Sequence, residues 1–191
     1  MSYQWPLDSQ SLFGERFSQI LNFSNFPRKD VEGVRDAIKE MWPHAASGWE
    51  FEWSKLAKSY SDAGKHAFAS AAYGWAKFPC LADENKRAAQ DNQLKEYLLA
   101  APNFGIDFER QVLELPYQGR TTKVPVHILT PFDVPEGGPV LIASGGVDTW
   151  KMDIHENLVK LATRLRIRVL AFDIAGTGES SVAMTSIVPS A

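Results

Sequence analysis

Cysteine is nearly absent from the sequence, with Cys80 as its one representative. A single cysteine excludes an internal disulfide and a zinc site made of several cysteines. The sequence also lacks an apolar run long enough to span a membrane, and residues 1–6 lack the basic start and apolar stretch of a signal peptide. We therefore expect a soluble protein of the cytoplasm, with no membrane partner.

Neither sign of charge dominates the sequence, whose formal net charge is -3 over 191 residues. This balance excludes the strongly basic surface by which proteins bind nucleic acids. The histidines are few and scattered, so their spacing predicts no metal site: they are His44, His66, His127 and His155. A hydrophobic content of 45%, with Phe and Trp both abundant, favours a packed core or an apolar ligand pocket.

The residue pattern changes near residue 104. Before this point helical spacing recurs, and its clearest stripe runs at i, i+4, i+7 and i+11 through Trp49, Trp53, Leu56 and Tyr60. After it, short apolar runs alternate with turns. Residues 101–105 are rich in turn-forming residues and separate the two regions. We therefore predict a helical domain over residues 1–104 and a second domain over residues 105–191.

The second domain combines strand patterns with one helical pattern. Residues 108–115 and 124–128 flank a turn and predict a β-hairpin. Residues 140–143 are apolar on both faces and too short for a helix, which predicts a buried strand. A helix over residues 154–165 and another buried strand over residues 168–172 follow. Strands that alternate with a helix indicate an α/β fold.

Two glycines and an acid follow the first buried strand, at Gly145, Gly146 and Asp148. Open α/β sheets bind ligands at the carboxyl ends of their strands, where backbone N–H groups can stabilise an oxyanion. The alternative is that the glycines only permit a tight turn between strand and helix. Asp148 either orients the loop or caps the next helix, and capping is the simpler interpretation. Nearby, Asp153 and His155 fall on different sides of that helix, so we expect both to be solvated.

A second glycine-rich segment, Asp173 to Ser180, follows the last predicted strand. Gly176 and Gly178 resemble the start of a dinucleotide-binding G-x-G-x-x-G, but the third position is Ser181 and no helical pattern follows. The Gly-Lys-Ser/Thr of a P-loop is absent. Ser180 stands in half of a G-x-S-x-G elbow that lacks its final glycine. We therefore predict a structural turn, without a cofactor and without a nucleophile at Ser180.

The second domain resembles the front of an α/β-hydrolase. The resemblance lies in V-L-I-A-S-G-G-V-D (residues 140–148), the helix that follows, and R-V-L-A-F-D-I-A-G-T-G-E-S (residues 168–180). With a helical domain ahead of it, the chain resembles the esterase/hydrolase family of the fermentation-respiration switch protein. That family also includes dihydropseudooxynicotine hydrolase and the fungal hydrolases that shorten polyketides in pigment synthesis. The most specific match is Gly145 to Asp153.

The resemblance implies a serine α/β-hydrolase that acts on an ester or on a C–C bond next to a ketone, in a polyketide-like or aromatic small molecule. It implies an oxyanion loop formed by backbone N–H groups of Gly145, Gly146 and Val147. Asp148 would orient this loop, and Trp150 would contact the substrate. The resemblance implies no cofactor and no metal. The family's serine, acid and histidine follow the fourth strand in that order, and no such set is present in this chain.

We therefore expect the front part of a longer hydrolase, truncated before the nucleophile elbow and inactive by itself. Its expected partners are a small-molecule substrate and the remainder of the hydrolase, in the same protein or as a separate chain. The resemblance also permits a homodimer. In the family's sheet a fifth strand pairs with residues 140–144, so without it this strand would expose an apolar edge. The alternative is a non-catalytic interaction module that completes its sheet with another chain.

Overall fold

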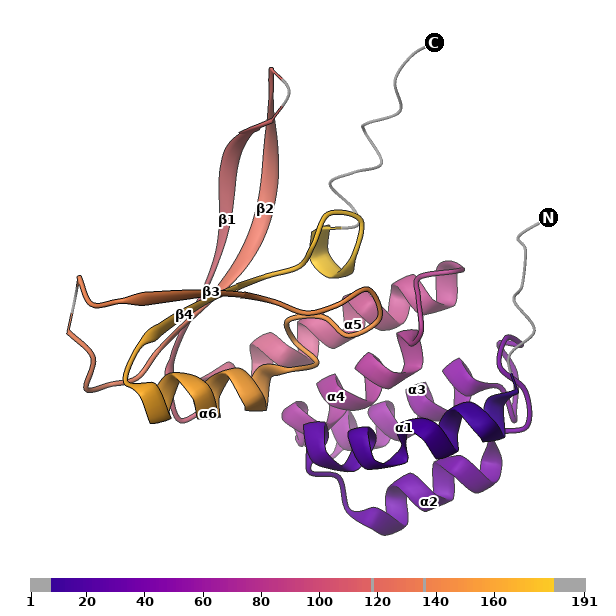
Figure 1. The fold of residues 1–191 in the computed structure, drawn as a ribbon. Coiled ribbons are helices and arrows are strands. Elements are labelled where there is room, and N and C mark those ends of the chain that lie inside the picture. Colours follow the sequence, from indigo (N-terminus) through magenta and orange to yellow (C-terminus); the bar gives the residue numbers. More distant parts are fainter. Residues whose placement is uncertain (1–7, 118, 136, 181–191) are drawn as a thin grey trace. The chain divides into compact units, whose positions relative to one another are not determined.

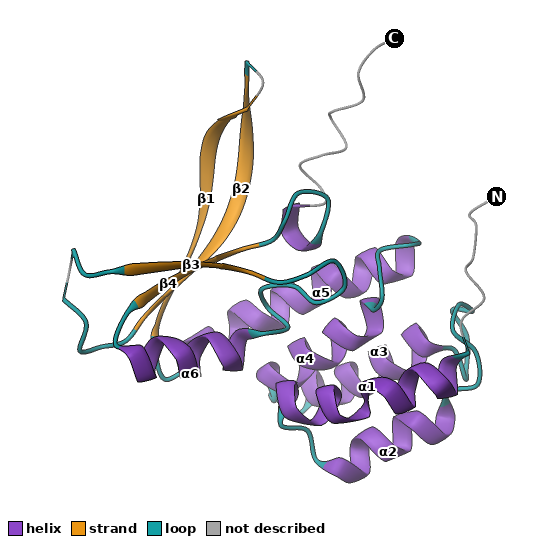
Figure 2. Ribbon diagram, viewed as in Figure 1, coloured by secondary structure: helices purple, strands orange, loops and turns teal. Residues whose placement is uncertain are grey.

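The computed structural model describes residues 8–117, 119–135 and 137–180. The chain divides into two compact units, Met1–Ala101 and Pro102–Ala191, whereas the sequence placed the boundary after residue 104. Figures 1 and 2 show that the described part of the first unit is helical and that the second contains a sheet. No helix in these described ranges is long and apolar enough to cross a membrane.

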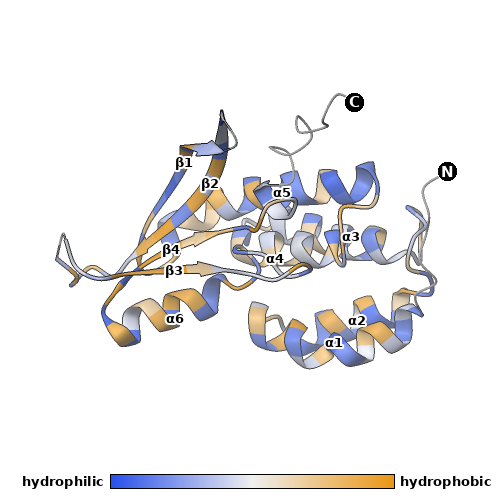
Figure 3. Cartoon of the chain, turned by 45° about the horizontal axis from the view of Figure 1, so that its top comes forward, coloured by the Kyte–Doolittle hydropathy of each residue, from blue (hydrophilic) through white to orange (hydrophobic). Residues whose placement is uncertain are grey.

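The first unit contains helices α1 (Ser9–Ser24), α2 (Arg28–Ala37), α3 (Trp49–Asp62), α4 (His66–Lys77) and α5 (Glu84–Ala100). Two of these helices begin at aspartate caps: Asp8 accepts from the Ser11 N–H at 2.6 Å, and Asp83 accepts from the Lys86 N–H at 2.9 Å. Figure 3 shows hydrophobic and hydrophilic residues alternating around α1 and α2, so each helix has an apolar face to bury. Helix α4 packs against both α3 and α5.

Trp53 lies at the centre of an aromatic core in this helical unit. Its side chain is fully buried, and four rings surround it at centroid distances of 5.8–6.4 Å: Phe13, Phe26, Trp49 and Trp75. Tilted and offset ring pairs of this kind add to the free energy gained by burial alone. The stripe predicted from Trp49 to Tyr60 is therefore confirmed as the buried face of α3.

The remaining elements are strands β1 (Asp107–Tyr117), β2 (Arg120–Thr130), β3 (Val140–Ser144) and β4 (Arg168–Phe172), helix α6 (His155–Leu165), and the short 3-10 helices η1 (Ala101–Asn103) and η2 (Gly178–Ser180). The sheet has the order β1-β2-β4-β3, in which β3 and β4 are parallel and the other pairs are antiparallel. The predicted hairpin, helix and later strands are confirmed, and the hairpin strands are longer than predicted.

Helix α6 covers one face of the sheet (Figure 1). Its residues Leu158 and Ala162 belong to a small core with Leu129, Val169 and Ala171 from β2 and β4. Because α6 joins two parallel strands, β3 and β4 end at the same edge of the sheet. The loop that follows β3 and the turn that follows β4 therefore begin next to each other.

Strand β3 lies at the edge of the described sheet and is half covered. Leu141 and Ala143 pack into the core under α6, whereas Val140 is 48% exposed and Ile142 is 68% exposed. The prediction that this strand is buried on both faces is therefore wrong for the described part of the chain, because no described segment covers Val140 and Ile142. The predicted open edge at residues 140–144 is confirmed within the same ranges.

Candidate functional site at the carboxyl ends of the parallel strands

The loop between β3 and α6 closes on itself through its own backbone. Gly145 approaches Thr149 so closely that a Cβ atom at residue 145 would overlap the Thr149 carbonyl, which explains the glycine. The Gly146 N–H donates to Thr149 O at 2.7 Å. The Trp150 indole N–H donates to Val147 O at 3.2 Å. These contacts fix the peptide groups on both sides of the second glycine.

The predicted oxyanion donors differ in what they can offer a ligand. The N–H of Gly146 already donates to Thr149 O. Val147 is 73% exposed, and its N–H donates no hydrogen bond within the described residues. Val147, at the exposed tip of the loop, is therefore a member of the predicted set whose N–H is available to an incoming oxygen.

Asp148 and Trp150 both bond within the loop. Asp148 accepts from the Thr149 hydroxyl at 3.2 Å, and Ile154 rather than Asp148 occupies the position before α6, without a side-chain cap. The capping interpretation of Asp148 is therefore wrong, and its orienting role stays a prediction. Trp150 is only 4% exposed, and its indole N–H donates a hydrogen bond to the Val147 carbonyl. Contact between Trp150 and a substrate also stays a prediction.

Asp173, directly after β4, joins the two neighbouring loops. Its Oδ1 accepts from the Lys151 backbone N–H at 2.8 Å, and its Oδ2 accepts from Lys151 Nζ at 2.6 Å and from the Glu179 N–H at 3.0 Å. The Ser180 hydroxyl donates to the Asp173 carbonyl at 3.1 Å. Gly178 adopts a positive φ of 49°, and a Cβ atom there would overlap the Asp173 carboxylate. These bonds give Ser180 and Gly178 structural roles in the turn.

Glu179 is a second point of convergence. Its Oε1 accepts from Arg110 Nε at 2.9 Å and from Arg110 Nη2 at 2.7 Å. Its Oε2 lies 2.8 Å from Lys151 Nζ and 3.0 Å from His127 Nε2. The side chains of Lys151 and Asp173 are fully buried, and those of His127 and Glu179 are at most 5% exposed. We call these five residues the buried charge network.

The charges of this network balance. Two cations, Lys151 and Arg110, face two carboxylates, Asp173 and Glu179. Burial lowers the pKa of His127, and the Lys151 cation lowers it further, against the opposing effect of Glu179. Burial raises the pKa of Glu179, but hydrogen bonds and charge from His127 and Lys151 outweigh burial and hold that pKa well below its usual value. A balanced network avoids an uncompensated buried charge, which proteins tolerate poorly.

His155 connects to this network through aromatic rings. It is 8% exposed, and its ring lies 4.0 Å from that of Phe104 between centroids. Phe108 follows at 5.4 Å from Phe104 and 5.2 Å from His127. Burial lowers the pKa of His155 to about 4, and His127 adds to the effect. The expectation of a solvated His155 is wrong, because this residue shares the inward face of α6 with Leu158.

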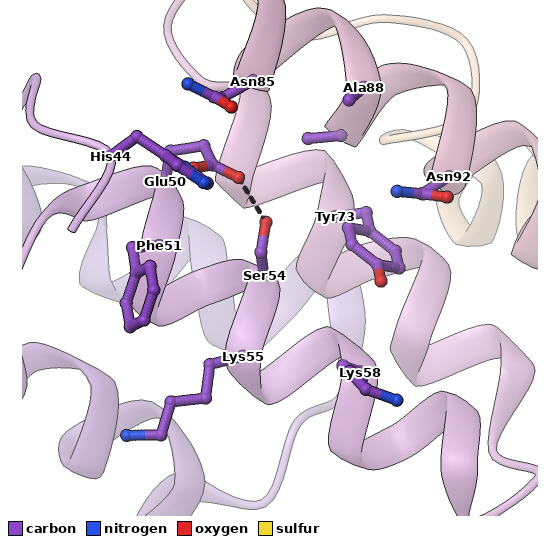
Figure 4. Close-up of a pocket in the computed structure, with 11 residues that line it drawn as sticks. His44, Glu50, Phe51, Ser54, Lys55, Lys58, Tyr73, Asn85, Ala88 and Asn92 are labelled. Atoms are coloured by element: carbon purple, nitrogen blue, oxygen red, sulfur yellow. Dashed lines mark hydrogen bonds and ion pairs between the residues drawn. The ribbon is translucent and has the colours of Figure 1, made fainter. Parts of the chain in front are cut away.

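The helical unit has a cavity of its own, of about 540 Å³, shown in Figure 4. At one end the buried carboxylate of Glu50 accepts from the Ser54 hydroxyl at 2.6 Å and contacts His44 Nδ1. In a nucleophilic triad the histidine stands between the serine and the acid, whereas here the acid is in the middle. The cluster therefore lacks the order that activates a serine. In the described residues, no group of three or more His, Cys, Asp or Glu side chains is arranged to hold a metal ion.

Comparison with known proteins gives matches among solved structures. No protein-family model matches the chain, and no curated protein does. The solved structure of wild-type AbyA5 matches with a TM-score of 0.67 at 20% identity, over 87% of this chain and 46% of that one. 2,6-Dihydroxy-pseudo-oxynicotine hydrolase matches with a TM-score of 0.63 at 23% identity, over 84% of this chain and 46% of that one.

The fold is that of the first part of an α/β-hydrolase. The fold class predicted from the sequence is thereby confirmed, as is the predicted resemblance to dihydropseudooxynicotine hydrolase at the level of the fold. The chain spans less than half the length of these solved structures. In this partial hydrolase fold, the buried charge network connects the loop that follows β3 to the turn that follows β4.

Glu179→Gln tests the charge balance of the network. We expect it to lower the free energy of unfolding of the second unit by about 3–5 kcal/mol, because buried Lys151 would keep only Asp173 as a carboxylate partner and the partly buried Arg110 would lose its own. Urea unfolding of protein labelled with 5-fluorotryptophan measures this, since Trp150 is the one tryptophan after residue 101 and its ¹⁹F signal reports on this unit. The matched control is Glu114→Gln, whose carboxylate is 65% exposed and 4.0 Å from Lys123 Nζ. Its effect should stay below about 1 kcal/mol, and equal losses would contradict the charge balance.

His155→Phe tests the acid sensitivity of the same unit. The folded-state pKa of His155, about 4, lies below its ordinary value of 6.5, so the folded state binds fewer protons and loses stability as the pH falls between these values. The difference corresponds to about 3 kcal/mol. We expect His155→Phe, which keeps an aromatic ring against Phe104, to lose about 3 kcal/mol less stability than the wild type when the pH falls through this range. The Trp150 ¹⁹F signal in urea at several pH values is the measurement, and parallel curves for the two proteins would refute the expectation.

Proposed function

We propose that this chain is the front part of a serine α/β-hydrolase and supplies its oxyanion loop and its helical region, but not its triad. The observation that carries the proposal is the loop of residues 145–150 at the carboxyl end of β3, beside the parallel strand β4, where open α/β sheets bind ligands. Among the described residues the loop tip, Val147, is exposed and offers an N–H, as an oxyanion donor must.

In the proposed mechanism a serine from the remainder of the hydrolase attacks the carbonyl carbon of the substrate. A histidine of that part takes the serine proton, and the carbonyl oxygen becomes an oxyanion. The N–H of Val147 and the N–H that follows the serine donate to this oxygen. Gly145 and Gly146 shape the loop rather than donate, because Gly145 must fit against Thr149 and the Gly146 N–H is bonded to it.

The proposed substrate is a polyketide-like or aromatic small molecule with an ester, or with a C–C bond next to a ketone. Both bond types present a carbonyl to the serine, so one oxyanion loop serves either. One solved neighbour is a hydrolase of 2,6-dihydroxy-pseudo-oxynicotine, which supports this class. We place the protein in the cytoplasm, with the remainder of the hydrolase and a second copy of the chain as proposed partners.

The first test asks where the nucleophile is. The protein is isolated from its source with an antibody against the helical unit, treated with a fluorophosphonate, and its intact masses are measured under denaturing conditions. We expect the label on a longer polypeptide or on a second chain, and none on a 21.3 kDa species. If the 21.3 kDa chain itself were labelled, and Ser180→Ala abolished the labelling, the triad assignment would be wrong. A single unlabelled 21.3 kDa species would contradict the hydrolase proposal.

The second test removes the proposed donor. Val147→Pro eliminates one N–H at an exposed position, and Val147→Ala is the matched control that keeps it. In the assembled hydrolase we expect the proline variant to lower kcat by roughly 10²–10³-fold, because one oxyanion donor is worth that much in related sites. The alanine variant should stay within about threefold of wild type. If the two variants had equal activity, the Val147 N–H would not be an oxyanion donor.

A second candidate function rests on the exposed edge of β3. An interaction module would pair another chain with Val140–Ser144 and cover Ile142, which is 68% exposed. The labelling experiment separates the candidates: an isolated complex whose second chain carries no fluorophosphonate label favours the module. A labelled second chain favours the hydrolase, because β3 would then complete a catalytic sheet.

A further inference from the structure

We propose that Lys151 is a positioning residue, which holds the loop of residues 145–149 in place through Asp173. The catalytic meaning of this role rests on the proposed function, because the same loop carries the proposed donor Val147. The structural claim is independent of that function and can be tested on the chain alone.

Lys151 is attached to Asp173 at two points. Its backbone N–H donates to Oδ1 at 2.8 Å, and its Nζ donates to Oδ2 at 2.6 Å. If a lysine were bound only through its ammonium group, its flexible side chain would still allow its backbone to shift. Here the backbone is bound directly, so the position of the main chain at residue 151 is set by the strand end at residue 173. Both side chains are fully buried, so water does not compete for either bond.

Thr149 and Trp150, which precede Lys151, connect it to the loop tip at Val147 by hydrogen bonds. Trp150 is anchored at its N–H by Asp153 Oδ2 at 2.8 Å, and its indole N–H donates to Val147 O at 3.2 Å. Thr149 O accepts from the Gly146 N–H at 2.7 Å. The peptide groups on both sides of the Val147 N–H are thus bonded to the two residues that precede Lys151.

Glu179 ties the same ammonium group to the hairpin. Lys151 Nζ lies 2.8 Å from Glu179 Oε2, and the opposite oxygen of Glu179 binds Arg110 on β1. The ammonium group of Lys151 therefore binds Asp173 directly after β4 and Glu179 in η2, and Glu179 in turn binds Arg110 on β1.

Amide hydrogen exchange of the 191-residue chain, followed by NMR, separates positioning from simple stabilisation. The probe amide is Gly146, and the reference amides are Val169 and Ala171 in β4. We expect Lys151→Met to speed exchange at Gly146 by at least about tenfold, through an opening that does not depend on added urea. Local openings expose little surface and are insensitive to denaturant, whereas global unfolding is sensitive. Unchanged Gly146 exchange, or an increase that tracks Val169 and Ala171 and depends on urea, would overturn the proposal.

Trp150→Phe is the second variant, because Lys151→Met removes a buried cation and can prevent folding. It removes the indole N–H that bonds Val147, together with part of the buried ring, and leaves the Lys151–Asp173 contacts in place. We expect faster exchange at Gly146 with unchanged exchange at Val169. No change at Gly146 would show that the loop is not held by this route. Both readouts are independent of hydrolysis, so a failed activity test and a failed exchange test refute different claims.

Discussion

The pair formed by Lys151 and Asp173 is the interaction on which the second unit depends. It joins the loop after β3 to the turn after β4 in a place from which water is excluded. Charges in such a place are tolerated only when they are matched, and Arg110 and Glu179 complete the match. The bonds among these residues therefore set the geometry of two loops at once.

This arrangement explains why a small sheet can present a defined loop. Helix α6 covers one face of the sheet with a few apolar side chains. Ile142, on the other face, is exposed. Apolar burial at β3 is thus one-sided among the described residues, and the polar network supplies specificity at the edge where the parallel strands end. Ile142 on β3 and Val147 in the loop are both exposed. In the proposed hydrolase a further strand would pair with β3, and the Val147 N–H would donate to the oxyanion.

The helical unit is organised differently. Its core is a group of aromatic rings around Trp53, and side-chain hydrogen bonds join its helices, as where the Tyr60 hydroxyl donates to Asp30 at 2.6 Å. Asp30 lies in the first turn of α2, which begins at Arg28. Burial raises the pKa of Tyr60 well above its ordinary value, and the bond to Asp30 raises it further, so the phenol stays a donor.

Much of the fold could be predicted from the sequence, because local patterns record it. The alternation in β2, the apolar run of β4 and the stripe of α6 each depend on neighbours a few residues apart. His155 also stands in the α6 stripe with Leu158, and that spacing was a signal for its burial.

The buried charge network could not be found in the same way. Its members come from β1, β2, the loop after β3 and the turn after β4, and no periodic pattern links Arg110 to Glu179 across 69 residues. Asp173 and Glu179 stood in a recognised turn motif, but their partners became visible only with the topology. The glycines at 145 and 146 were correctly placed after a strand, whereas the bond of the Gly146 N–H to Thr149 depends on a loop conformation that composition does not specify.

A double-mutant cycle between Lys151 and Asp173 tests the central claim most directly. The free energy of unfolding of the second unit is measured from the Trp150 ¹⁹F signal for wild type, Lys151→Met, Asp173→Asn and the double variant. Coupled neighbours in a shared network give interaction energies that the single variants do not sum to, and we predict at least about 2 kcal/mol for this pair. A coupling energy below about 0.5 kcal/mol would mean that the two residues act independently, and the loop would have to be held by other contacts.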